Sequence, residues 1–177
     1  MKLPAAYTEL PREALFERIR KAKAQLGADA IILGHYYQQD DVFRFADFRG
    51  DSLELSRAAA AQKAAKYIIF CGVDFMAETA AMLCEPYQHV LLPAGEAACP
   101  MALMASADDA GPAWDYLTAR WGEGSFRPIT YQNSSAELKA FCGRRGGAVC
   151  TSSNAGAIFR CRPGVTGRPA ALFADGG

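Results

Sequence analysis

The sequence lacks an excess of charge of either sign, since its 19 Lys and Arg residues balance its 19 Asp and Glu residues. A nucleic-acid-binding protein usually carries a basic excess, so this composition argues against nucleic acid as a partner. No apolar run approaches the roughly 18 residues of a membrane span, and we expect no membrane partner. The start of the chain also lacks the apolar stretch of a signal peptide. We therefore expect a cytoplasmic protein.

Closely paired cysteines are also absent, because no two of the six cysteines have C-x-x-C spacing. This counts against a zinc ribbon, a thioredoxin-type dithiol and a ferredoxin cluster loop. We expect most of the cysteines to be small buried hydrophobes, with Cys71 and Cys150 inside strands. The spacing assigns no role to Cys84, Cys142 or Cys161. The P-loop, G-x-G-x-x-G, H-E-x-x-H and G-x-S-x-G motifs are missing too, so nucleotide hydrolysis and serine-hydrolase chemistry have no motif support.

Short apolar runs alternate with longer segments of helical periodicity, which predicts an α/β fold. We expect strands at 30–33, 67–71, 89–92, 128–131 and 148–150. We expect helices at 10–26, 51–66, 74–84, 101–106, 113–121 and 134–141. Capping boxes are predicted at Asp51 with Glu54 and at Ser134 with Glu137, and Asp74 is expected to cap its helix. This alternation is typical of a short parallel sheet with helices on both faces, a three-layer αβα arrangement.

The same pattern suggests a division into three parts. We expect an N-terminal helical segment at 1–27, a first αβα domain at 28–108 and an incomplete second αβα domain with an irregular tail at 109–177. From Asn154 onward, Gly and Pro make up 7 of 24 residues. Two interpretations of this tail remain open. It is either a flexible C-terminus or the truncated or frame-shifted end of a longer protein.

Candidate site residues follow the predicted strands, where ligands bind in open parallel sheets. His35 and Tyr37 come directly after the first strand, and an imidazole there can hold an anion or move a proton. A structural hydrogen bond is the alternative role for His35. Ser52 and Ser152 lie near helix starts, where hydroxyls and free N–H groups hold carboxylates or phosphates. Ordinary N-capping is the alternative for both serines.

Cys99 differs from the other cysteines because it follows a strand and a loop and precedes Pro100. Such a loop can present a thiolate to a metal, but a single cysteine cannot hold a cluster. Any further ligands therefore have to come from elsewhere in the fold.

Several segments, in this order and spacing over about 120 residues, resemble quinolinate synthases. The matching pieces are GHYYQ at 34–38, AD at 46–47, GDSLEL at 50–55, FCGVDFMAETA at 70–80, LP at 92–93, EAACPM at 96–101, YQNSSAE at 131–137 and TSSNA at 151–155. No single piece is decisive, but the ensemble is specific.

The resemblance implies an enzyme that condenses iminosuccinate with dihydroxyacetone phosphate to quinolinate, a precursor of NAD. It implies three similar αβα domains around a central site and a [4Fe-4S] cluster held by three cysteines, one from each domain. By the same resemblance, Cys99 is a cluster ligand and Tyr37 assists proton movement. It also implies L-aspartate oxidase as a possible supplier of iminosuccinate. The residues that it places against substrate are His35, Ser52, Tyr131, Asn133 and Ser152.

The sequence departs from this family in length, because family members are much longer. We therefore expect a truncated homologue that lacks two cluster cysteines and does not assemble the usual cluster alone. Three functions stay open: a quinolinate synthase represented by its N-terminal part, a non-catalytic α/β module that binds a small dicarboxylate or phosphate, and an inactive truncation product.

Overall fold

The computed structural model describes residues 4–160 and contains two compact units, residues 1–98 and the residues from Cys99 onward. The elements of the first unit are α1 (Ala5–Thr8), α2 (Arg12–Leu26), a 3₁₀ turn (Gly27–Asp29), β1 (Ala30–His35), α3 (Asp40–Phe43), β2 (Phe48–Gly50), α4 (Ser52–Ala61), β3 (Tyr67–Cys71), α5 (Asp74–Leu83) and β4 (His89–Leu91). The elements of the second unit are a 3₁₀ turn (Pro100–Leu103), α6 (Ala107–Trp121), β5 (Ile129–Tyr131), α7 (Ala136–Arg144), β6 (Ala148–Cys150) and α8 (Ala155–Arg160).

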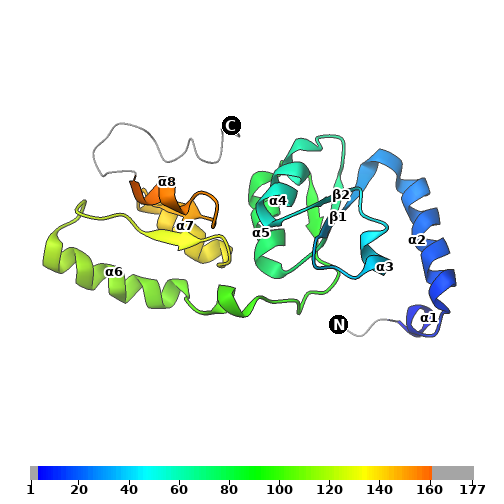
Figure 1. Ribbon diagram of the computed structural model, residues 1–177, viewed down its shortest axis with the longest axis horizontal. Helices are drawn as coiled ribbons and strands as arrows, with labels where there is room; N and C mark the ends of the chain where they lie inside the picture. Colours follow the sequence, from blue (N-terminus) through cyan, green and yellow to red (C-terminus); the bar gives the residue numbers. More distant parts are fainter. Residues whose placement is uncertain (1–3, 161–177) are drawn as a thin grey trace. The chain divides into compact units, whose positions relative to one another are not determined.

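The first unit is built on a parallel sheet of four strands in the order β2-β1-β3-β4. Helices α4 and α5 cover one face of this sheet, and α2 and α3 lie on the other (Figure 1). The expected α/β fold with helices on both faces of a short parallel sheet is therefore confirmed. In such a sheet all strands end at the same edge, which gathers the residues that follow them.

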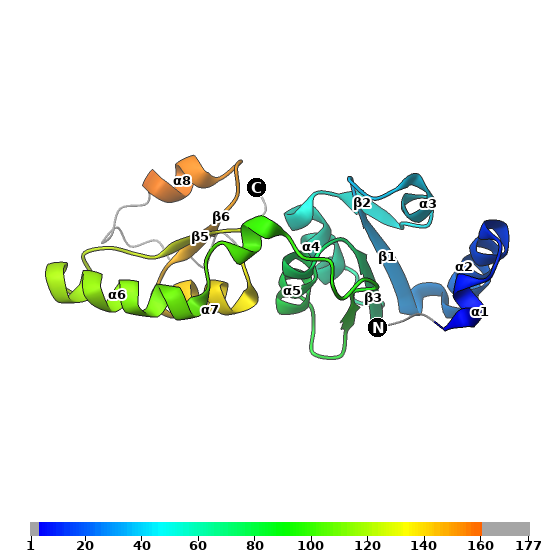
Figure 2. The same ribbon diagram turned by 90° about the horizontal axis from the view of Figure 1, so that it is seen from below.

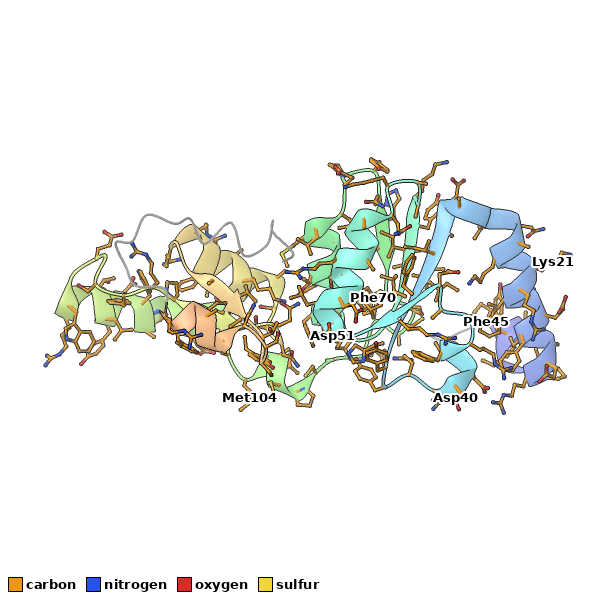
Figure 3. The ribbon with its side chains drawn as sticks, turned by 45° about the horizontal axis from the view of Figure 1, so that its top comes forward. Lys21, Asp40, Phe45, Asp51, Phe70 and Met104 are labelled. Atoms are coloured by element: carbon orange, nitrogen blue, oxygen red, sulfur yellow. The ribbon has the colours of Figure 1, made fainter. Side chains whose placement is uncertain are left out.

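The core of the first unit follows from strand alternation, because successive side chains point to opposite faces. Leu33 pairs with Phe70 in the sheet register, and both are fully buried on the face toward α4 and α5 (Figure 3). On the other face Ile32 packs with Phe16 of α2 and with Phe45. The two phenylalanine rings meet edge to face, with their centroids 5.3 Å apart.

The second unit contains a parallel pair of strands, β5 and β6, with Tyr131 beside Cys150 at the carboxyl ends. Helix α7 lies on one face of this pair and α8 on the other (Figure 2). Helix α6 packs against α7 through the ring of Trp114. This ring meets that of Phe141 edge to face, with the two centroids 6.3 Å apart. A two-stranded sheet is stable only with helices packed on it, and α7 supplies most of its apolar cover, with Leu138, Phe141 and Cys142 buried.

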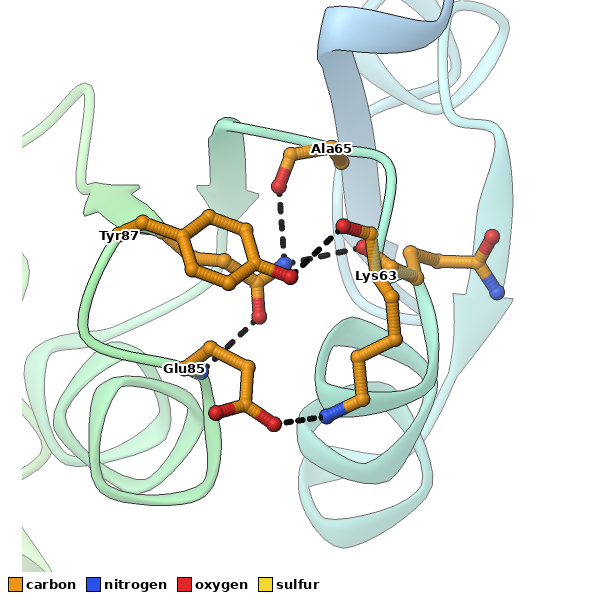
Figure 4. Close-up of polar contacts among 6 residues, drawn as sticks. Lys63, Ala65, Glu85 and Tyr87 are labelled. Atoms are coloured by element: carbon orange, nitrogen blue, oxygen red, sulfur yellow. Dashed lines mark hydrogen bonds and ion pairs between the residues drawn. The ribbon is translucent and has the colours of Figure 1, made fainter.

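Helix α4 ends at Ala61, so the expectation that it continues to Lys66 was wrong. The buried amide of Gln88 donates to the carbonyl oxygens of Gln62 and Ala65, both at 2.9 Å, and accepts from the amide of Glu85 at 3.0 Å. Figure 4 shows this polar cluster, in which Lys63 also forms an ion pair with Glu85. These bonds satisfy carbonyls that a continued helix would use, and they turn the chain into β3.

Two expected helix caps were placed one residue away from the cap that forms. Ser135 caps α7 by accepting from the amide of Leu138 at 3.2 Å, whereas the hydroxyl of Ser134 donates to the carbonyl of Tyr131 at 2.8 Å. The N-cap of α5 is Val73, and Asp74 is the first helical residue. The capping box of Asp51 and Glu54 is confirmed.

Other helix boundaries also differ from those expected from the sequence. The segment after Cys99 forms only a 3₁₀ turn, and α6 begins at Ala107 because Ser106 caps it and Pro112 is accommodated inside it. The short elements α1, α3 and β2 were not expected. Cys150 is buried as predicted, and Cys71 is only partly buried. Cys161 and the tail beyond it lie outside the described residues. No helix within residues 4–160 is long and apolar enough to cross a membrane.

Candidate functional site

His35 and Tyr37 form the first group of candidate residues, at the carboxyl end of β1. Their rings are tilted against each other with centroids 4.0 Å apart. The amide of Tyr37 donates weakly to Nδ1 of His35 at 3.4 Å, which leaves Nε2 as the N–H donor of the neutral ring. The phenol oxygen of Tyr37 lies 3.7 Å from Sδ of the buried Met76 on α5. The structure thus brings His35 and Tyr37 together at the end of β1.

Burial lowers the pKa of His35 below its ordinary value, and the nearby Asp51 carboxylate raises it in part. The imidazole is therefore neutral at pH 7, because the ordinary pKa of about 6.5 already lies below that pH. A neutral imidazole donates one hydrogen bond and accepts another. His35 is thus suited to orienting a polar substrate or exchanging a proton near neutral pH.

Ser52 belongs to the same end of the sheet. Gly50 pairs with His35 in the register of β1 and β2, and Ser52 follows two residues later as the first residue of α4. The cap of α4 is Asp51, whose Oδ1 accepts from the amide of Glu54 at 2.8 Å. Capping was the alternative role for Ser52, and the structure assigns it to Asp51 instead.

Gly50 is required where the chain enters α4. A Cβ atom at this position would lie 2.6 Å from Oε2 of Glu54, the carboxylate oxygen that accepts from the amide of Asp51 at 3.4 Å. A larger residue would therefore displace Glu54 and disturb the helix start that carries Ser52.

The second group of candidate residues lies in the second unit and forms two pairs. The hydroxyls of Tyr131 and Ser152 are 2.6 Å apart, across the carboxyl ends of β5 and β6. Ser152 therefore does not cap α8, which begins at Ala155. The amide nitrogen of Asn133 lies 3.6 Å from Sγ of Cys99, which is half-buried. The predicted residues of this unit are thus brought together, each with a named partner.

Cys99 carries the kind of side chain that binds iron in clusters, and its sulfur is half-buried beside the amide of Asn133. Within residues 4–160 no three His, Cys, Asp or Glu side chains are arranged to hold a metal ion.

The sequence did not identify two residues that act on the candidate site residues. Asp51 was identified only as a helix cap, although its charge acts on His35. Met76 was covered only by the expected helix 74–84 and by the matched segment 70–80, although its sulfur lies 3.7 Å from the phenol oxygen of Tyr37. Neither contact has a signal in sequence spacing, since each joins residues on different elements.

Comparison with known proteins gives a consistent result. Residues 17–166 match the family described as Quinolinate synthetase A protein. A quinolinate synthase of Nocardioides sp. is 52% identical over 164 residues, which cover 90% of this chain and 42% of that protein. The quinolinate synthases of Halalkalibacterium halodurans and Haloarcula marismortui are 52% and 51% identical over 154 and 158 residues. These stretches cover 87% and 89% of this chain and 42% of each relative.

The chain spans about two fifths of the length of the curated relatives that it matches. The family match nevertheless covers most of the chain and includes every candidate residue of both units. The chain therefore belongs to the quinolinate synthase family.

Proposed function

We propose that this chain carries part of a quinolinate synthase, which condenses iminosuccinate with dihydroxyacetone phosphate to quinolinate in the synthesis of NAD. The supporting observation is an identity of 52% over 90% of the chain to a quinolinate synthase. A cytoplasmic location and an L-aspartate oxidase that supplies iminosuccinate belong to the same proposal. The roles of individual residues are those that the resemblance to this family implies, and the chemistry of each group supports them.

In the first unit, His35 and Ser52 bind a substrate carboxylate. The neutral imidazole offers its Nε2–H, and Ser52 offers a hydroxyl beside the free amides at the start of α4. A helix of ten residues also contributes partial positive charge at that end, which favours an anion. Tyr37, with its phenol near Met76 and its ring on His35, assists proton movement at the substrate.

In the second unit, Tyr131 and Asn133 contact substrate or intermediate, and Ser152 binds a carboxylate. The short bond between Tyr131 and Ser152 orients both hydroxyls before an anion arrives. Cys99 supplies one of three thiolate ligands to a [4Fe-4S] cluster, and Asn133 donates to its sulfur. When bound, the iron site supplies a Lewis acid that polarises a substrate oxygen.

A second candidate is a non-catalytic module that binds a small dicarboxylate or phosphate. The observation that favours it is the lack of a three-ligand metal group within residues 4–160. Iron content after anaerobic reconstitution separates the two candidates when this chain is joined to the C-terminal part of a family member that supplies the further ligands. The enzyme predicts bound iron that Cys99→Ser reduces, and the module predicts no iron that depends on Cys99.

Binding of a dicarboxylate tests the part of the proposal that both candidates share. Malate serves as the probe in isothermal titration calorimetry of the chain. Ser52→Ala should weaken malate binding about tenfold, because a hydrogen bond to a charged group is worth about 1.5–3 kcal/mol. Ser125→Ala, which removes an exposed hydroxyl bonded to Trp121, is the control and should bind like the parent chain. Equal affinities for all three proteins would count against a carboxylate site at Ser52.

A further inference from the structure

Lys139 is a buried lysine for which the proposed chemistry has no use. Its side chain is 7% exposed, on α7 among the buried Leu138, Phe141 and Cys142. Lysine is almost never fully buried, because removing an ammonium group from water is costly. The neighbouring buried residues of α7 are apolar, so a charged side chain at this position needs a structural explanation.

The direction of the side chain adds to this cost. Lys139 is the fourth residue of α7, and its ammonium turns back to the start of the helix, where Nζ donates to the carbonyl of Ser134 at 2.8 Å. The start of a helix carries partial positive charge and disfavours a cation. Burial and the helix dipole thus both act against an ammonium at this position. The hydrogen bond to the carbonyl of Ser134 is one of the contacts that offset this cost.

That carbonyl belongs to the loop 132–135, which joins β5 to α7 and begins directly after Tyr131. The hydroxyl of Ser134 holds the carbonyl of Tyr131 at 2.8 Å, and the amide of Ser134 donates to the carbonyl of Gln132 at 2.9 Å. The amide of Gln132 in turn donates to the carbonyl of Cys150 at 2.8 Å. Lys139 thus donates to the carbonyl of Ser134, whose hydroxyl in turn holds the carbonyl of Tyr131.

The loop carries both candidate contacts of this unit. Tyr131 meets Ser152 at its hydroxyl, and Asn133 meets Cys99 at its sulfur. Ser134 is buried and is the neighbour of Asn133 in sequence, so a shift at Ser134 would move both contacts.

We propose that Lys139 is a positioning residue, whose buried ammonium fixes the loop 132–135 so that Tyr131 and Asn133 reach Ser152 and Cys99. The proposal rests on the proposed function for the binding role of those residues. Lys139 itself touches no substrate in this account. It acts through the carbonyl of Ser134.

The test compares Lys139→Met with the parent chain. Methionine keeps the length of the stem and removes the ammonium, and replacing a buried charge by an apolar residue often preserves stability. Lys63→Met, which removes an exposed lysine paired with Glu85, is the matched control. Two quantities are measured for each protein: the hydrogen-exchange rates of individual amides and the affinity for malate.

In Lys139→Met we expect the amides of Gln132 and Ser134 to exchange at least tenfold faster, while those of Phe141 and Cys142 keep their rates. Malate affinity should fall about tenfold, and Lys63→Met should change neither quantity. Unchanged rates at Gln132 and Ser134, or an equal rise throughout α7, would overturn the proposal in favour of a merely structural lysine.

Two other outcomes also decide the role of Lys139. If the parent chain does not bind malate, the proposed function fails, but the exchange rates still decide the role of Lys139. If Lys139→Met does not fold, Lys139→Gln replaces it. Its side chain is shorter and neutral, so no ammonium reaches the carbonyl of Ser134. The same local rise in exchange supports the proposal, and its absence contradicts it.

Discussion

His35 is the residue at which burial and a neighbouring carboxylate act on charge in opposite directions. Burial lowers the pKa of the imidazole and is the larger effect, and Asp51 raises it. The folded chain therefore binds fewer protons at His35 than the unfolded chain does when the pH falls through about 6.5. Protonation then favours the unfolded state, so the stability contributed by His35 is complete above that pH and decreases below it.

His35→Gln should accordingly make the free energy of unfolding less dependent on pH between about 7.5 and 5. Urea unfolding at several pH values measures this, with His89→Gln as the control for the other histidine. The parent chain and His89→Gln should lose stability more steeply than His35→Gln as the pH falls. Parallel profiles for all three would contradict the assignment of a half-buried neutral imidazole at His35.

Position along the sequence identified the candidate residues, but not the partners that fix them. His35 is the last residue of β1, and its place at a strand end, where ligands bind in a parallel sheet, made it a candidate. Ser152 was a candidate through its place near a helix start, and Tyr131 through the family resemblance. The contact of Met76 with Tyr37 and the bond from Lys139 to Ser134 were not predictable. Such contacts depend on how side chains from different elements meet, which no local spacing records.

At the scale of elements, strands were predicted best where an apolar run has clear limits. The run 67–71 forms β3 and the run 148–150 forms β6, with the predicted bounds in both cases. Helix ends were predicted less well, because the nearest serine is not always the cap. The hydroxyl of Ser134 donates to the carbonyl of Tyr131, and Ser135 caps α7 instead.

Gln88 illustrates how a tertiary contact ends a helix. Gln88→Leu removes three hydrogen bonds from buried or half-buried groups and leaves the carbonyls of Gln62 and Ala65 without that donor. We expect the free energy of unfolding to fall by about 2–4 kcal/mol, as measured by urea denaturation.

The control for Gln88 lies in the same cluster (Figure 4). Glu85→Gln removes the charge that pairs with Lys63 on the surface. It keeps the backbone amide of residue 85, which donates a hydrogen bond to the side-chain oxygen of Gln88. Because exposed ion pairs contribute little, this change should cost much less than Gln88→Leu. Equal losses for the two variants would show that the buried amide does not hold the end of α4.

At the scale of the whole molecule, the candidate residues are divided between two units. The first unit contributes His35, Tyr37 and Ser52, and the second contributes Cys99 with Tyr131, Asn133 and Ser152. The chain spans about two fifths of its relatives, and its described residues offer a single cysteine with the features of a cluster ligand. A complete cluster therefore requires thiolates from beyond the described residues.

A full-length chimera supplies those thiolates. Residues 1–155 of this chain, joined to the Nocardioides protein from the residue that aligns with Gly156 onward, give a protein in which Cys99 can meet its expected co-ligands. Circular dichroism establishes that the chimera and its variants fold. Anaerobic reconstitution with iron and sulfide then loads the cluster.

The most direct test of the account is the iron content and quinolinate production of this chimera, compared with its Cys99→Ser variant. The account predicts about four iron atoms per chain and quinolinate from iminosuccinate and dihydroxyacetone phosphate, with both lost in Cys99→Ser. A Cys99→Ser chimera that keeps its iron and its activity would contradict the assignment of Cys99. A folded chimera that makes no quinolinate would contradict the proposed enzyme.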